Sequence, residues 1–216
     1  MTESATRFIV VEGPIGVGKT SLARRLAASF GSDLLLEGPE ENPFLPRFYA
    51  DPKSHAMPTQ LSFLLQRVRQ LEALQQADLF RPVQVADYLL EKDRLFAELT
   101  LDASELELYD RIAERLVERL PVPDLVIYLQ APVPVLQERI RQRGRDYERD
   151  METAFLEQLS DAYTRFFHHY DSAPLLIVNA AEADFVHSDE EYGLLLEQVR
   201  TPRHGRHFFN PAPLGL

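Results

Sequence analysis

The sequence predicts a doubly wound α/β fold, in which a parallel five-stranded sheet is flanked by helices. Two observations predict it: five short apolar runs recur along the chain, and longer amphipathic patterns lie between them. Several runs are apolar throughout, as expected of strands that are buried on both faces of a parallel sheet. Alternation of such strands with helices is typical of doubly wound domains, which bind ligands beyond the carboxyl ends of their strands.

The expected elements follow one another along the chain without an internal repeat or a linker. The strand candidates are residues 8–11, 34–36, 83–86, 125–129 and 175–178. Helical patterns cover residues 19–30, 58–77, 90–119 (as two helices), 133–143, 152–170 and 189–200. Pro121 and Pro123 end one helix and prepare the next strand. Residues 1–216 are therefore expected to form one domain, with a C-terminal tail over about 201–216.

Composition limits the class of protein. The 216 residues are 45% hydrophobic and 26% charged, which suits one globular domain. There is no Cys, so a disulfide scaffold and a Cys-ligated metal site are excluded. No apolar run approaches the roughly 18 residues of a membrane span, and the first residues lack the form of a signal peptide, so we expect a cytoplasmic protein with no membrane partner. The net charge of −11 argues against nucleic acid as the main partner.

The residues after the first expected strand match the phosphate-binding pattern G-x-x-x-x-G-K-[ST]. The stretch reads Gly13-Pro14-Ile15-Gly16-Val17-Gly18-Lys19-Thr20-Ser21. Its backbone N–H groups would surround phosphates, Lys19 would reach the β and γ oxygens, and the Thr20 hydroxyl would ligate Mg²⁺. A Gly-rich turn that caps a helix is the alternative. Because a strand pattern precedes the stretch and a helix pattern follows it, we interpret it as a P-loop that binds ATP.

Two carboxylates end neighbouring strand candidates. Glu37 follows the second run and is well placed to take a proton from a substrate hydroxyl. Glu40 and Glu41, a few residues on, are interpreted as solvated loop carboxylates. Asp87 ends the third run and could either hold Mg²⁺ through water or assist the base.

Polar residues on the helical pattern at 58–77 share one stripe. Gln60, Phe63 and Arg67 are spaced i, i+3, i+7, so an amide, an aromatic ring and a guanidinium lie in one row. Such a row can clamp a nucleobase, although a solvent-facing stripe has the same spacing. Asp93, in the charged run Glu91 to Arg94, is equally compatible with a site role and with a helix N-cap.

The densest Arg cluster lies near the end of the helix expected at 133–143. Arg139 and Arg143 are i, i+4 neighbours, and Gly144 ends the helix before Arg145. A mobile Arg-rich lid over about 142–150 would suit phosphoryl transfer, because fixed cations stabilise the charge that spreads over the transferring oxygens. A solvated basic helix is the alternative.

Taken together, these motifs resemble the deoxynucleoside kinase family, particularly the bacterial deoxyadenosine/deoxyguanosine kinases, over Phe8 to about Val199. The resemblance implies that Glu37 is the general base and that Lys19, Arg139, Arg143 and Arg145 act on phosphates. It further implies that Tyr49 and Glu148 hold the sugar 3′-hydroxyl, and that Gln60, Arg67 and Asp93 read the base. Residues 179–185 are expected on the adenine of ATP, and a homodimer through the helices at 58–77 and 104–119.

Two departures from the family pattern concern individual residues. The family has Asp/Glu-Arg-Ser after its third strand, whereas this chain has Asp87-Tyr88-Leu89, which leaves Arg94 as a candidate for the missing cation. The family's Glu-Pro is Glu37-Gly38-Pro39 here, so the loop is one residue longer.

The sequence thus predicts a P-loop kinase that uses ATP and Mg²⁺ to phosphorylate the 5′-hydroxyl of a deoxynucleoside, with a purine base expected. A nucleoside monophosphate kinase of the thymidylate kinase type is the enzymatic alternative, but it has no need of the acid at Glu37. A non-catalytic nucleotide-binding subunit is the alternative from another class, and the intact set of Lys19, Thr20, Glu37 and lid arginines argues against it.

Overall fold

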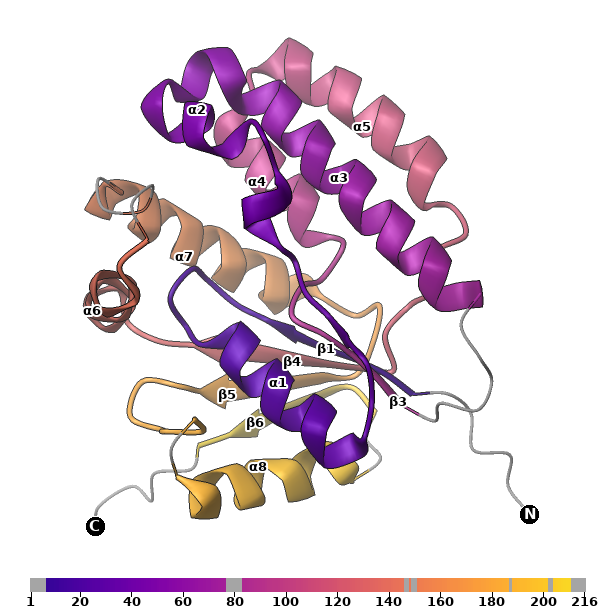
Figure 1. Ribbon diagram of the computed structural model, residues 1–216, viewed down its shortest axis with the longest axis vertical. Helices are drawn as coiled ribbons and strands as arrows, with labels where there is room; N and C mark the ends of the chain where they lie inside the picture. Colours follow the sequence, from indigo (N-terminus) through magenta and orange to yellow (C-terminus); the bar gives the residue numbers. More distant parts are fainter. Residues whose placement is uncertain are drawn as a thin grey trace.

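The computed structural model describes residues 7–76, 83–145, 148, 151–186, 188–201 and 204–210. It shows a central parallel sheet between two layers of helices (Figure 1). The strands are β1 (Arg7–Glu12), β2 (Leu34–Leu35), β3 (Val83–Ala86), β4 (Leu125–Gln130), β5 (Leu175–Asn179) and β6 (Arg206–Phe209). Their order in the sheet is β2-β3-β1-β4-β5-β6, and every pair is parallel.

The sheet therefore has six strands, and the prediction of five was wrong in number. The additional strand, β6, pairs with β5 from residues that were assigned to the C-terminal tail. Its Arg-His-Phe-Phe sequence alternates between exposed and half-buried positions, and Phe208 is 75% exposed. Because an edge strand has only one neighbour to pack against, its sequence carries little of the apolar signal that marks the central strands.

The helices cover both faces of the sheet. They are α1 (Lys19–Phe30), α2 (Leu45–Ala50), α3 (Pro52–Gln76), α4 (Lys92–Thr100), α5 (Ala103–Val117), α6 (Val133–Arg143), α7 (Thr153–His169) and α8 (Asp189–Arg200). Three of them, α1, α6 and α8, have the predicted bounds. Helix α3 begins earlier than predicted because Pro58 lies inside it rather than at its start. Asp102 separates α4 from α5, since it caps α5 in a capping box with Glu105.

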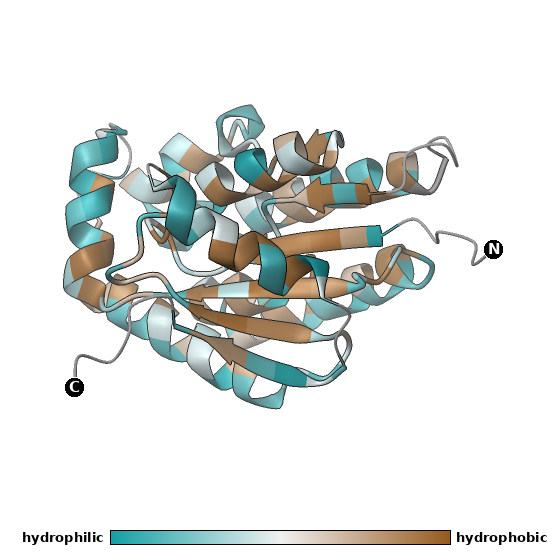
Figure 2. Ribbon diagram, turned by 90° about the horizontal axis from the view of Figure 1, so that it is seen from below, coloured by the Kyte–Doolittle hydropathy of each residue, from teal (hydrophilic) through white to brown (hydrophobic). Residues whose placement is uncertain are grey.

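Two apolar cores lie on opposite faces of the sheet. One packs α1 and α8 against residues such as Ile9 and Val11, and the other packs α3, α4 and α7 against Phe8 and Val10. Figure 2 shows the hydrophobic strands at the centre and hydrophilic residues on the outer sides of the helices. Alternate residues of β1 thus face different cores, which explains why its sequence is apolar throughout.

The parallel arrangement brings the carboxyl ends of the strands to one edge of the sheet. The P-loop follows β1, Glu37 follows β2, Asp87 follows β3, and residues 180–186 follow β5. Of the predicted lid, residues 142–145 and 148 are described, and the others lie outside the described residues. In the part of the chain that the structure describes, no helix is long and apolar enough to cross a membrane.

Candidate functional site

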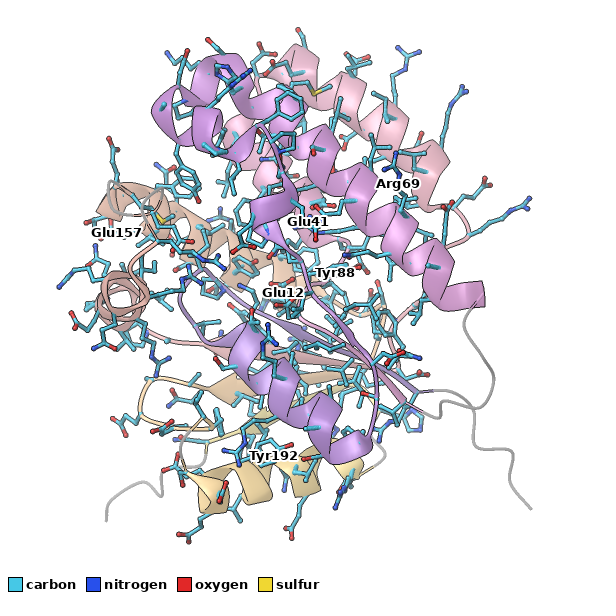
Figure 3. The ribbon with its side chains drawn as sticks, in the orientation of Figure 1. Glu12, Glu41, Arg69, Tyr88, Glu157 and Tyr192 are labelled. Atoms are coloured by element: carbon cyan, nitrogen blue, oxygen red, sulfur yellow. The ribbon has the colours of Figure 1, made fainter. Side chains whose placement is uncertain are left out.

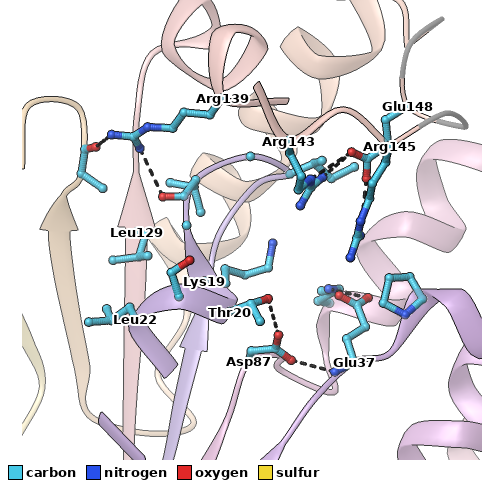
Figure 4. Close-up of a pocket in the computed structure, with 18 of the residues that line it drawn as sticks. Lys19, Thr20, Leu22, Glu37, Asp87, Leu129, Arg139, Arg143, Arg145 and Glu148 are labelled. Carbon is cyan, nitrogen blue, oxygen red and sulfur yellow. Dashed lines mark hydrogen bonds and ion pairs between the residues drawn. The ribbon is translucent and has the colours of Figure 1, made fainter. Parts of the chain in front are cut away.

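A cavity of about 740 Å³ opens at this edge, between the P-loop, α3, α4, α6 and the loop after β5 (Figure 4). Its size suits a small-molecule site. The structure brings nearly all the predicted site residues into its lining: Ile15, Gly16, Val17, Gly18, Lys19, Thr20, Ser21, Glu37, Tyr49, Gln60, Phe63, Arg67, Asp87, Asp93, Arg139, Arg143, Arg145 and Glu148. Gly13 and Pro14 do not line the cavity.

The P-loop packs closely against its neighbours. At Gly16, φ is +85°, and a Cβ would lie 2.8 Å from the backbone oxygen of Leu136, so only glycine fits there. Lys19 Nζ donates to the backbone oxygens of Gly13 at 2.7 Å and Pro14 at 3.3 Å. In the structure, the Lys19 ammonium is thus hydrogen-bonded to two carbonyls. Phosphate oxygens would compete with these carbonyls for its N–H donors. Burial, together with the charge of nearby Lys92, lowers the pKa of Lys19.

Thr20, Asp87 and Glu37 are joined by hydrogen bonds across three elements. Thr20 Oγ1 donates to Asp87 Oδ2 at 2.5 Å, and the Glu37 backbone N–H donates to Asp87 Oδ1 at 2.7 Å (Figure 4). A hydroxyl and a carboxylate beside a phosphate-binding loop are the oxygen ligands that Mg²⁺ takes, with substrate phosphates and waters completing its shell. The described residues contain no group of three or more His, Cys, Asp or Glu that could hold a metal ion.

The Glu37 carboxylate meets two cations. Its Oε1 lies 2.8 Å from Lys92 Nζ and also forms an ion pair with Arg67. Burial alone would raise the pKa of the Glu37 carboxyl, but Lys92, Arg67 and Lys19 outweigh it and hold that pKa well below its usual range. These cations therefore keep the Glu37 carboxylate in its ionised form.

Helix α3 fixes the backbone of the loop that carries Glu37. Gln70 donates to the Leu36 backbone oxygen at 3.0 Å, and Gln66 donates to that of Glu37 at 2.8 Å. The additional residue of this loop, Gly38, has φ of +57° and precedes the short 3-10 turn Pro39–Glu41. Of the two glutamates in this turn, Glu41 accepts a hydrogen bond from Gln66, and Glu40 pairs with Arg145.

Helices α3 and α4 together build a polar wall. Arg67 forms a second ion pair with Asp93, and its guanidinium lies 5.0 Å from the ring centre of Phe63. Gln60 Nε2 donates to Thr100 Oγ1 at 3.2 Å. Asp93 Oδ2 is buried and has no hydrogen-bond partner among the described residues, so an acceptor is available in this wall.

The arginines of the lid contact protein groups in this structure. Arg139 donates to the backbone oxygens of Val17 at 3.3 Å and Ala180 at 2.9 Å, and so links the P-loop to the loop after β5. Arg143 forms an ion pair with the buried Glu148 at 2.5 Å. Arg145 forms ion pairs with Glu40 and, at 3.7 Å, with Glu148.

Sequence reasoning missed Lys92. It read the run Glu91 to Arg94 as polar, but α4 turns Lys92 and Asp93 into the cavity and Arg94 outward, where Arg94 pairs with Glu98 and Asp110. Arg94 is therefore wrong as the candidate for the missing cation. Lys92 and Asp93 are buried and Arg94 is exposed because of where each falls on the turns of α4, and a run of four charged residues does not reveal this in the sequence.

Two further residues that support the site were also missed. Glu12, fully buried at the end of β1, accepts hydrogen bonds from the N–H of Gly13 at 2.8 Å, the N–H of Leu89 at 2.7 Å and the hydroxyl of Tyr163 at 3.0 Å. Figure 3 labels Glu12 near the centre of the molecule. Glu12 ends an apolar run, and nothing in that pattern indicates a role for its carboxylate. Its hydrogen bonds connect the P-loop to the segment after β3 and to α7.

The other supporting residue, Arg25, holds the loop after β5. It donates to the backbone oxygens of Phe185 at 3.0 Å and Val186 at 3.1 Å, and it lies 4.0 Å above the Tyr192 ring. Residues 182–186 line the cavity at this point. They include most of the segment that was expected to pack on adenine.

Comparisons with known proteins agree with this geometry. The family model for deoxynucleoside kinase matches residues 9–202. The chain is 37% identical to a deoxyguanosine kinase of Bacillus subtilis, with 89% of this chain and 96% of that protein covered. It is 31% identical to a deoxyadenosine kinase of Lactobacillus acidophilus, with 83% and 88% covered. A solved deoxyadenosine kinase from M. mycoides, with the products dCMP and dCDP bound, is 25% identical, and it superposes with a TM-score of 0.79 over 89% of this chain and 98% of that one.

Proposed function

The chain belongs to the deoxynucleoside kinase family, and from that premise we propose that it transfers the γ-phosphoryl group of ATP to the 5′-hydroxyl of a purine deoxynucleoside, either deoxyadenosine or deoxyguanosine. The product is the 5′-monophosphate, which serves nucleotide salvage. The observation that carries the proposal is that an ionised carboxylate, Glu37, shares one cavity with the P-loop.

In the proposed reaction Glu37 accepts the hydroxyl proton. The hydroxyl oxygen bonds to the γ-phosphorus while the bond from that phosphorus to the β–γ bridging oxygen breaks, and ADP leaves. Lys19, Arg139 and Arg143 stabilise the charge on the transferring oxygens, with Arg145 on the phosphates of ATP. For this the arginines exchange their present carbonyl and carboxylate partners for phosphate oxygens.

We assign Mg²⁺ to Thr20 and Asp87. Their adjacent hydroxyl and carboxylate oxygens support the assignment, and the ion would neutralise phosphate charge when bound. Residues 182–186 are assigned to the adenine of ATP because they line the cavity on the side of β5.

The nucleoside occupies the side of the cavity next to α3 and α4. Gln60, Arg67 and Asp93 supply an amide, a guanidinium and an acceptor for the base, and Phe63 supplies a ring for stacking. Tyr49 and Glu148, which also line the cavity, are assigned to the sugar 3′-hydroxyl. The acceptor on Asp93 Oδ2 suits an N–H donor on the edge of a base, and the names of the relatives, deoxyguanosine kinase and deoxyadenosine kinase, support a purine.

Release of ADP from ATP with a panel of nucleosides and nucleotides tests the proposal. We expect deoxyadenosine or deoxyguanosine to give a higher kcat/KM than thymidine, and thymidine monophosphate to give none. A preference for thymidine would contradict the purine assignment. Turnover of monophosphates alone would favour a monophosphate kinase, and binding of ATP without turnover would favour a regulatory subunit.

We further propose a cytoplasmic homodimer that does not bind nucleic acid. Helix α3 exposes Leu65 by 42% and α5 exposes Leu108 by 50%, and self-association through these helices would bury both side chains. The charge of −11 disfavours polyanions, and a chain without Cys suits a reducing compartment. Sedimentation equilibrium should give twice the 24.8 kDa of one chain, and Leu65→Glu should lower that mass, whereas a monomeric wild type would contradict the dimer.

A further inference from the structure

Lys92 is a buried cation inside the candidate site. It is one of only three lysines in the chain, and α4 begins with it. Its side chain is 4% exposed, and it lines the same cavity as Lys19 and Glu37. Burying an ammonium group is costly unless a carboxylate compensates its charge, so the partner of Lys92 identifies what the residue serves.

That partner is one oxygen of Glu37. Lys92 Nζ lies 2.8 Å from Oε1, and the Arg67 guanidinium contacts the same oxygen. The shortest contact of each cation with this carboxylate is to Oε1, and within the described ranges no hydrogen bond is made to the other oxygen, Oε2. Two cations thus hold the carboxylate by one side and leave the other side for a substrate.

The two cations differ in what else they contact. Arg67 is also paired with Asp93 and lies near the rings of Phe63 and Tyr88, which ties it to the wall assigned to the base. For Lys92 Nζ, the described residues offer no carboxylate contact except that of Glu37. Among the described residues, Glu37 is therefore the carboxylate that compensates the buried charge of Lys92.

We infer that Lys92 is a positioning residue for phosphoryl transfer: it holds the Glu37 carboxylate in the orientation that presents Oε2 to the acceptor hydroxyl. The inference rests on the proposed function. The hydroxyl proton passes to Oε2 as the new bond to the γ-phosphorus forms and ADP departs. Misplacing this oxygen by about 1 Å is enough to cost roughly 10²-fold in rate, so an anchor on Oε1 matters for the chemical step more than for binding.

A double-mutant cycle tests whether Lys92 acts through Glu37. We expect Lys92→Met to lower kcat by about 10²-fold while the KM values for nucleoside and ATP change only a few-fold. Lys92→Arg, which keeps the charge, should recover part of the loss. In a Glu37→Gln background, adding Lys92→Met should lower kcat by less than about threefold, because the group that Lys92 positions is already inactive.

The matched control is Lys53→Met, which makes the same substitution at an exposed lysine of α3 and should leave kcat unchanged. A wild-type kcat for Lys92→Met, or losses that multiply in the double variant, would overturn the inference; multiplying losses would mean that Lys92 acts on the phosphoryl group directly. Thermal melting checks that Lys92→Met is folded. If it is not, Lys92→Gln replaces it in the same cycle.

Turnover of deoxynucleosides by the wild type is measured first. Its absence overturns both the proposed function and the role of Lys92. When turnover is present, every outcome of the cycle bears on Lys92 alone.

Discussion

At the scale of single residues, the charge of Glu37 is decided by its neighbours. A buried carboxyl normally gains a proton, because burial penalises the charged form. Here Lys92, Arg67 and Lys19 outweigh that penalty and keep the pKa below its usual range. The base form of Glu37 therefore persists to acidic pH, and activity should not be lost as the pH falls through the ordinary titration range of a carboxyl group.

Replacement of the base gives the first prediction at this scale. Glu37→Gln keeps the size and the hydrogen-bonding capacity of the side chain but cannot accept a proton. Loss of a general base typically costs about 10²–10⁴-fold, so steady-state assays should show a fall in kcat of that order. The KM for ATP should stay within a few-fold, since the P-loop is unchanged.

The glutamates of the following turn are the controls. Glu40 pairs with Arg145, and Glu41 accepts a hydrogen bond from Gln66, whereas the carboxylate of Glu37 pairs with Lys92 and Arg67. Glu40→Gln and Glu41→Gln should therefore have mild effects. A large loss in either one would move the base to that residue, and normal turnover by all three variants would favour a monophosphate kinase.

Residues that a local motif defines were predictable from the sequence. The Gly-rich pattern marked the P-loop, and the ends of apolar runs marked Glu37 and Asp87. These two carboxylates and residues 15–21 of the P-loop line one cavity. Lys92 and Glu12 were not predictable, because their roles depend on partners distant in sequence, namely Glu37 for the first and Leu89 and Tyr163 for the second.

At the scale of elements, the lid at the end of α6 yields the next prediction. Arg143 contacts Glu148 in this structure, and a role in the transition state requires it to contact the phosphoryl group instead. Arg143→Ala should then lower kcat by on the order of 10²-fold or more, with little change in the nucleoside KM, as expected of a donor that acts mainly in the transition state.

Arg141→Ala is the matched control, because Arg141 lies on the same helix with its side chain 71% exposed and paired with Glu138. Its steady-state parameters should equal those of the wild type. An unchanged kcat for Arg143→Ala would contradict this role and favour the alternative interpretation, in which the segment is a solvated basic helix.

Elements were predictable where their periodicity was strong. The bounds of α1, α6 and α8 follow directly from apolar spacing and end signals such as Gly144. The six-residue α2 and the edge strand β6 were missed because each gains its stability from tertiary contacts, α2 by packing on α3 and β6 by pairing with β5. Short elements of this kind carry too few residues for a period to be recognised.

At the scale of the whole molecule, the buried tyrosines predict how the fold responds to alkaline pH. Burial raises the pKa of Tyr109 to about 12, and it raises the pKa values of Tyr88, Tyr163 and Tyr170 as well. A folded-state pKa above the unfolded value gives stability that is complete below about pH 10 and is lost as the pH rises through the folded value.

The free energy of unfolding should therefore fall above about pH 10, by up to roughly 1.4 kcal/mol per pH unit for each buried tyrosine. Chemical denaturation at several pH values measures this slope, and Tyr109→Phe should remove the contribution of one tyrosine from it. Tyrosinate absorbance should rise together with the loss of circular dichroism. Ionisation of all the tyrosines while the fold persists would contradict the prediction.

The order of the strands in the sheet also bears on how this chain can diverge. The groups assigned to the acceptor nucleoside, apart from Glu148, come from residues 37–93, whereas the lid arginines and the adenine loop come from residues 139–186, and β1 with its P-loop lies between the two halves of the sheet. Substitutions in the first stretch can therefore alter which base is accepted without rebuilding the half that handles ATP. A change of nucleoside substrate and retention of ATP as the phosphoryl donor are therefore physically separable here, because the residues assigned to each lie in successive segments of the chain that contribute different sides of the cavity.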